Sequence, residues 1–270
     1  MDPVFATAAG LGALIGLLLA LTGAGGSILA VPLLLFGLHL GVAQAAPVAL
    51  LAVALAAGVG ALIGLRAGIV RYRAAALMAL AGMVLAPLGL LLAQRLPNAP
   101  LTLIFAAVLL FVAVRMFRQA RAPATPDADK APPPCRLDGG SGRFVWTAAC
   151  GRALALSGAT AGFLSGLLGV GGGFVIVPAL RRASDAPMQA IVATSLAVIT
   201  LVSAFGVVTT GLSGHLDWRI GLPFAAGAIA GMLGGRLFAA RLSGARLQQG
   251  FALVAGLIAV AMALRVALAG

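Results

Sequence analysis

The segment 166–180, GLLGVGGGFVIVPAL, contains four glycines within five positions and a proline near its end. In a helix interior, glycine costs about 1 kcal/mol relative to alanine, and proline costs about 3 kcal/mol. The other residues of the segment are apolar and would suit a continuous buried helix. The pattern therefore predicts a helix that is interrupted at its glycine run, and it indicates that the interruption has a function.

The rest of the chain is typical of a membrane protein. It has 270 residues, of which 62% are hydrophobic and 9% charged, and it contains no glutamate. Six long uncharged stretches follow Arg73; they are 74–94, 96–114, 153–180, 186–216, 220–235 and 247–264. About 20 apolar residues are enough to cross a bilayer as a helix. We therefore expect an all-α polytopic membrane protein, in contact with the lipid bilayer along most of its length.

The sequence repeats at an offset of 146 residues. Residues 12–34 align without gaps on residues 158–180, and 11 of the 23 positions are identical. The identical positions include Gly25 with Gly171 and Pro32 with Pro178. This internal duplication predicts two homologous repeats, each with its own broken helix.

A polar segment rich in proline and glycine separates the repeats. We expect three parts: a first transmembrane repeat over 1–118, a flexible linker over 119–144 and a second repeat over 145–270. Each repeat is predicted to contain an interrupted segment and three further transmembrane helices. The interrupted segments are 4–37 and 150–180, and the helices are 42–65, 74–94 and 99–117, then 188–212, 219–240 and 246–268.

The positive charges favour one orientation. If each interrupted segment enters the membrane and returns on the same side, 15 of the 18 Lys and Arg residues share one face. If each segment crosses once, the division is 12 to 6. The sharper asymmetry favours inverted repeats, a cytoplasmic linker and both termini outside, although the length of the segments alone leaves both alternatives open. This placement also explains the net charge of +12 without nucleic acid.

The breaks are candidate anion sites. A helix that begins inside the membrane has unpaired N–H groups and a partial positive charge at that end. Glycine lets an anion approach these groups closely. We expect Gly171, Gly172 and Gly173 to bind substrate from the second repeat, and Gly25, Gly26 and Ser27 to bind it from the first.

Other small residues have a simpler interpretation. Pro32 and Pro178 each remove one backbone donor, and we expect them to kink the short helices. Glycines spaced by four residues elsewhere are expected to let helices pack closely. They are Gly12 and Gly16, then Gly158, Gly162 and Gly166, and finally Gly227, Gly231 and Gly235.

The motifs resemble those of the TauE/SafE family of sulfite exporters. The second repeat carries that family's glycine run followed by V-P-x-L over Gly169–Leu180, and the first repeat carries a weaker form in which Ser27 replaces a glycine. ATSLAVI (193–199) and GHLDWR (214–219) are also similar to the family's second half. The resemblance implies an inner-membrane permease for a small anion such as sulfite or a sulfonate. We expect it to export this anion by alternating access.

Within 193–199, the hydroxyls of Thr194 and Ser195 would donate to an anion's oxygens, or bond back to a carbonyl one turn earlier. The resemblance adds weight to the first alternative. Thr22, beside the first break, is a weaker candidate for the same role.

Nothing in the sequence indicates an enzyme. The glycine run lacks the Lys-Ser/Thr of a phosphate-binding loop, and we expect no catalytic residues, no cofactor and no metal site. Cys135 and Cys150 suggest no disulfide framework.

We expect interfacial roles for Asp217, His39 and His215, and snorkelling for Arg236. A homo-oligomer is compatible with the sequence. The alternative function is a membrane assembly or scaffold protein that does not transport.

Overall fold

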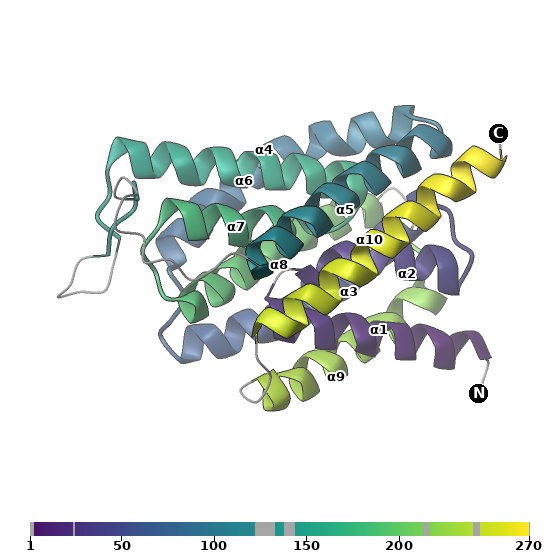
Figure 1. The fold of residues 1–270 in the computed structure, drawn as a ribbon, viewed down its shortest axis with the longest axis horizontal. Coiled ribbons are helices and arrows are strands. Elements are labelled where there is room, and N and C mark those ends of the chain that lie inside the picture. Colours follow the sequence, from purple (N-terminus) through teal and green to yellow (C-terminus); the bar gives the residue numbers. More distant parts are fainter. Residues whose placement is uncertain are drawn as a thin grey trace.

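The computed structural model describes residues 3–23, 25–121, 133–137, 144–212, 216–239 and 244–269. These ranges are almost wholly helical, with two isolated β-bridges (Cys135–Ser184 and Leu137–Phe144) (Figure 1). The elements are α1 (Pro3–Thr22), the 3₁₀ helix η1 (Gly25–Leu29), α2 (Ala30–Gly37), α3 (Val42–Arg66), α4 (Tyr72–Arg95), α5 (Asn98–Arg121), α6 (Ala148–Leu168), α7 (Gly173–Ala183), α8 (Met188–Leu212), α9 (Trp218–Ala239) and α10 (Gly244–Ala269).

Seven of the described helices are long and apolar enough to cross a membrane. They are α1, α3, α4, α5, α8, α9 and α10. This confirms the predicted all-α polytopic class. The remaining described helices, η1, α2, α6 and α7, belong to the two interrupted segments.

The predicted break in the second repeat separates α6 from α7. Gly169 ends α6 with a φ of 70°, and its N–H donates to the Ser165 carbonyl at 2.8 Å. Gly171 and Gly172 follow with φ values of 75° and 67°, and α7 begins at Gly173. The left-handed region costs other L-residues about 1–2 kcal/mol. The glycines therefore let the chain reverse within a few residues.

Each interrupted segment folds back on itself, so that its second helix returns toward the end where its first helix began. Cys135 shows this for the second repeat, because it is disulfide-bonded to Cys150 in the first turn of α6 and donates its N–H to the Ala183 carbonyl at the end of α7, at 2.9 Å. In the first repeat α2 folds back along α1: a Cβ on Gly37 would lie 2.6 Å from Leu11 Cδ1. Each interrupted segment is therefore a helical hairpin in the structure, while the inverted orientation of the repeats stays a prediction.

The helix boundaries follow the sequence repeat. Adding 146 to the bounds of α3 gives those of α8, and adding 146 to the first residues of α4 and α5 gives those of α9 and α10. The packing joins one repeat to the other: α1 packs on α9, α6 on α4, α3 on α8 and α5 on α10. Each repeat therefore completes its helix packing with the other.

The ends of the molecule separate the connections into two groups. Figure 1 shows both termini at one end, and the α3–α4 connection and the start of α6 at the opposite end. Three long helices, α3, α4 and α5, connect the α1–α2 hairpin of the first repeat to the α6–α7 hairpin of the second. The α1–α2 hairpin and the α6–α7 hairpin therefore open at opposite ends of the molecule.

The periodic glycines lie where helix backbones touch. A Cβ on any of five of them would collide with a backbone carbonyl of the partner helix: Gly12 with Phe224 and Gly16 with Ala228, on α9, and Gly158 with Met78, Gly162 with Gly82 and Gly166 with Ala86, on α4. Gly227 and Gly231 contact the carbonyls of Ala9 and Ala13 on α1 in the same way, and Gly235 lies against Ala20. The structure therefore confirms the packing interpretation of these glycines.

The structure joins the two cysteines, which the sequence analysis did not anticipate. Cys135 and Cys150 are separated by 15 residues, and closing a loop of this length is worth about 3 kcal/mol in the chain-entropy account. Nearby, the Leu137 N–H donates to Asp185 Oδ1 at 2.9 Å. Residues 133–137 thus hold the α6–α7 hairpin at its open end. The rest of the polar segment, 122–132 and 138–143, lies outside the described residues.

Candidate anion site at the helix breaks

The start of α7 has no side-chain cap, and its polar groups are those of the backbone. Gly172 is its N-cap residue, and the first hydrogen bond here runs from the Val175 N–H to the Gly172 carbonyl, at 3.1 Å. The N–H groups of a helix's first turn have no partner within the helix. They point toward the break, where the helix dipole favours negative charge.

The glycines at this break have no room for side chains. A Cβ on Gly171 would lie 2.7 Å from Ser203 Oγ, 3.0 Å from Val53 Cγ1 and 3.3 Å from Ile199 Cγ2. A Cβ on Gly172 would lie 2.5 Å from the Ala161 carbonyl oxygen. The turn is therefore enclosed by α3, α6 and α8.

The first break is constructed differently. Its chain continues from Gly23, at a φ of 74°, into the 3₁₀ helix η1. The Gly26 N–H donates to Thr22 Oγ1 at 3.1 Å, and that hydroxyl donates to the Leu18 carbonyl at 2.7 Å. Thr22 thus caps the first break, and one of its N–H groups is already used. Ser27 is fully buried.

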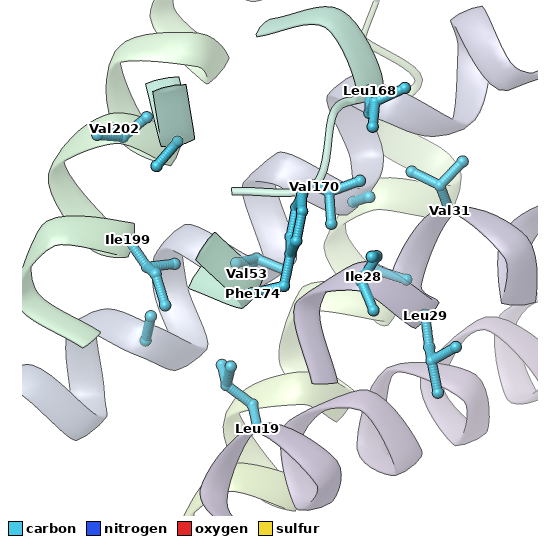
Figure 2. Close-up of a cluster of buried hydrophobic side chains, with 14 of the residues drawn as sticks. Leu19, Ile28, Leu29, Val31, Val53, Leu168, Val170, Phe174, Ile199 and Val202 are labelled. Carbon is cyan, nitrogen blue, oxygen red and sulfur yellow. The ribbon is translucent and has the colours of Figure 1, made fainter. Parts of the chain in front are cut away.

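The two breaks meet in the middle of the molecule. Helix α7 contacts η1, and Figure 2 shows buried apolar side chains from both breaks pointing toward one another, together with residues of α3 and α8. They include Ile28, Leu29, Val53, Leu168, Val170, Phe174 and Ile199, none more than 7% exposed. This arrangement closes the breaks off from water.

The predicted hydroxyl ligands on α8 are engaged elsewhere. Thr194 Oγ1 accepts a hydrogen bond from the Arg71 N–H at 3.0 Å, and Ser195 Oγ donates to the Val192 carbonyl at 2.8 Å. The α8 residues next to Gly171 are instead Ile199 and Ser203, one and two turns beyond Ser195. The structure brings the glycines of the second break together with Ser203, which the sequence analysis did not single out. Only its polarity within an apolar run distinguishes it in the sequence.

A small pocket lies beside the second break, between α4, α6 and α8. Its lining includes Ser165 and Gly166 of α6 with Val202 and Thr210 of α8. About 20 Å³ is accessible to the centres of water molecules, enough for about one water. In the other repeat the 146-residue offset places Arg236 opposite Leu90 of this lining, and the Arg236 guanidinium donates to the Gly60 carbonyl at 3.0 Å. The two repeats therefore differ at this position as well.

The remaining polar candidates lie at helix ends. Asp217 Oδ1 accepts from the Arg219 N–H at 2.9 Å, at the start of α9. His39 is exposed, with a φ of 54° in the connection from α2 to α3. His215 lies outside the described residues.

Comparisons with known proteins identify a family of membrane transporters. The family model described as "Sulfite exporter TauE/SafE" matches residues 8–262. A "Probable membrane transporter protein" of Xylella fastidiosa strain 9a5c is 35% identical over 267 residues, covering 95% of this chain and 92% of the relative, and its counterpart in strain Temecula1 is also 35% identical.

A shorter match adds a third relative. The "Probable membrane transporter protein YunE" of Bacillus subtilis is 39% identical over 97 residues, which are 36% of this chain and 33% of the relative. No solved structure matches. The duplicated glycine–proline motif, the seven candidate spans and the match over nearly the whole length together assign the chain to the TauE/SafE sulfite exporter family of membrane transporters.

Proposed function

We propose that the protein is an inner-membrane permease that exports a small sulfur-containing oxyanion, such as sulfite or a sulfonate. The observation that carries the proposal is the buried start of α7, where Gly171, Gly172 and Gly173 leave backbone N–H groups uncovered by any Cβ. Such a helix end binds an anion without a charged side chain. The family's name supports an anion of this class.

The transport step is alternating access between two inverted repeats. Matching helix boundaries, helix packing across the repeats and hairpins at opposite ends support this mechanism. In the described arrangement, apolar side chains seal both breaks. Transport therefore requires one hairpin to move against α3 and α8, so that water and the anion reach the start of α7 from one side at a time. No covalent chemistry is needed, and we assign no catalytic role to any residue.

The repeats contribute unequally to binding in this proposal. The first break has one N–H group bonded to Thr22 and forms a 3₁₀ helix, whereas the second begins an α-helix of 11 residues. We assign the main anion contacts to Gly171–Gly173. Gly25, Gly26 and Ser27 lie at the facing break, and we assign no anion contact to Thr194 and Ser195, because their hydroxyls are hydrogen-bonded to the protein.

A flux measurement tests the proposal. Proteoliposomes that contain the purified protein are expected to release labelled sulfite and methanesulfonate faster than protein-free liposomes. Methanesulfonate is the stricter probe, because it stays ionised across the working pH range and crosses bare lipid poorly. Folded protein that moves neither anion would contradict the proposal and favour the scaffold alternative.

We further propose that the end bearing the α3–α4 connection faces the cytoplasm, because described arginines gather at its helix ends. They are Arg66, Arg71 and Arg73 around that connection, Arg152 near the start of α6, and Arg181 and Arg182 at the end of α7. The Cys135–Cys150 disulfide lies at this end. Disulfides are rare in a reducing cytoplasm, so this orientation requires the pair to be reduced in the cell.

Cysteine labelling distinguishes the two orientations. In a Cys135→Ser/Cys150→Ser background, Ala67→Cys and Pro97→Cys each place one thiol at an exposed connection, on opposite ends of α4. In intact cells an impermeant maleimide is expected to label the variant at position 97 and to spare the one at position 67. Labelling with the opposite pattern would place the arginine-rich end outside.

A further inference from the structure

Ser203 differs from the other hydroxyl side chains of α8 in having no hydrogen-bond partner among the described residues. Ser195, Thr200, Thr209 and Thr210 donate to a carbonyl three or four residues earlier, the usual arrangement in such helices, and Thr194 accepts from the Arg71 N–H. Ser203 is also fully buried. An ordinary intrahelical bond therefore does not account for this hydroxyl.

The Ser203 hydroxyl faces the turn that leads into α7. Its Oγ lies 2.7 Å from the position that a Cβ on Gly171 would occupy. Gly171 has a φ of 75° and lies two residues before the first residue of α7. Ser203 Oγ and the uncovered N–H groups of this helix end are thus next to one another, on two different elements.

Leaving this hydroxyl unpartnered costs free energy. Burying a polar group without a hydrogen bond destabilises the folded state, and alanine would fill nearly the same volume without that penalty. No described residue compensates for this, because Ser203 Oγ has no hydrogen-bond partner. Val53 Cγ1 and Ile199 Cγ2, which lie with Ser203 Oγ around the Cβ position of Gly171, are methyl groups. A ligand that enters the break would supply the missing acceptor.

We propose that Ser203 Oγ donates a hydrogen bond to one oxygen of the transported anion while the N–H groups at Gly171–Gly173 hold its other oxygens. This inference rests on the proposed function. The 146-residue offset pairs Ser203 with Ala57, so the first repeat has no equivalent hydroxyl. The anion is therefore held by the second repeat.

The same geometry selects among sulfur oxyanions. Three oxygens of an SO₃ group find donors at the glycines and Ser203, and the fourth position of sulfur faces the methyl groups of Val53 and Ile199. In sulfite that position is a lone pair and in a sulfonate it is carbon, so neither buries a further oxygen. Sulfate would bury its fourth oxygen against these methyl groups without a donor, and it binds more weakly for that reason.

The experiment measures melting temperature in detergent at constant ionic strength, with titrations of sulfite, methanesulfonate and sulfate. A ligand that binds the folded state raises the melting temperature, which yields a Kd. Wild type is expected to respond to sulfite and methanesulfonate at lower concentrations than to sulfate. Ser203→Ala is expected to weaken binding of the first two about 10- to 100-fold, since it removes one hydrogen bond to a charged group.

A matched control separates binding from folding. Ser184 is also buried, but its Oγ donates to the Leu180 carbonyl at 2.7 Å. Ser184→Ala should lower the melting temperature without anion and keep the wild-type Kd. Ser203→Ala should melt no lower than wild type without anion, because its hydroxyl has no protein partner to lose.

Every other outcome contradicts one part of the proposal. If neither sulfite nor methanesulfonate stabilises wild type, the proposed function and this inference both fail. If wild type responds and Ser203→Ala keeps the same Kd, only the inference about Ser203 fails. If Ser203→Ala melts well below wild type without anion, the hydroxyl has a structural partner and the inference is likewise wrong. If sulfate binds as tightly as methanesulfonate, the selection by Val53 and Ile199 is wrong.

Discussion

Gly162→Val is expected to leave about a tenth or less of the wild-type yield of folded protein. The site lies at the α4–α6 contact, where even a single Cβ would collide with the backbone of Gly82. Overpacking a core costs about 1–3 kcal/mol when side chains can adjust. Here the obstacle is backbone, so the two helices must separate along their length. Each 1.4 kcal/mol of folding free energy that is lost lowers the ratio of folded to unfolded protein about tenfold. Size-exclusion chromatography of detergent-solubilised membranes measures the yield.

Gly151→Val is the matched control for this change. Gly151 lies on the same helix, and a Cβ there would meet nothing within 4 Å. It should give close to the wild-type yield, because only the intrinsic helix preference changes. Equal yields from the two variants would show that α4 and α6 do not depend on close backbone contact.

Gly171→Ala is expected to reduce anion flux about 100-fold or more while most of the protein still folds. The added methyl would lie 2.7 Å from Ser203 Oγ, between that hydroxyl and the start of α7, and would cover the approach to the helix end. Losing two hydrogen bonds to a charged ligand, each worth about 1.5–3 kcal/mol, accounts for at least this reduction. Flux of methanesulfonate in proteoliposomes, normalised to folded protein, measures it.

Gly68→Ala controls for backbone strain. Gly68 has a φ of 69°, close to the 75° of Gly171, but a Cβ there would meet nothing within 4 Å. Both variants place alanine in the left-handed region, at a cost of about 1–2 kcal/mol, and only Gly171→Ala should lose flux. An equal loss from both would attribute the effect to strain. Gly172 is a poorer choice, since a Cβ there also approaches the Ala161 backbone.

Much of the fold follows from the sequence, because a feature that is clear in one repeat predicts the same feature in the other. The alignment of 12–34 with 158–180 located both breaks, and the 146-residue offset relates the bounds of α3 and α8. Periodic glycines such as Gly158 and Gly162 also identified the closest helix contacts, since small residues are what bring helix backbones together in a membrane. These are local patterns, and they carry over to structure directly.

The features that the sequence did not reveal depend on tertiary placement. Segment length could not show whether the chain crosses or returns at Gly169–Gly173, because either path satisfies the backbone hydrogen bonds. Ser203 looks like any serine in an apolar helix until the turn at Gly171 is placed against it. The pairing of Cys135 with Cys150 likewise depends on how the polar segment folds over the α6–α7 hairpin.

The exchange of partners between the repeats sets a waiting time during synthesis. Helix α1 carries its glycine face from the start, but α9, which covers that face, follows about 200 residues later. At about 5–20 residues per second, the ribosome needs roughly 10–40 s to reach it. Through this interval the helix already satisfies its own backbone hydrogen bonds, and lipid surrounds its apolar surface as readily as a partner helix would. The bilayer therefore holds the nascent first repeat in an assembly-competent form until the second repeat arrives.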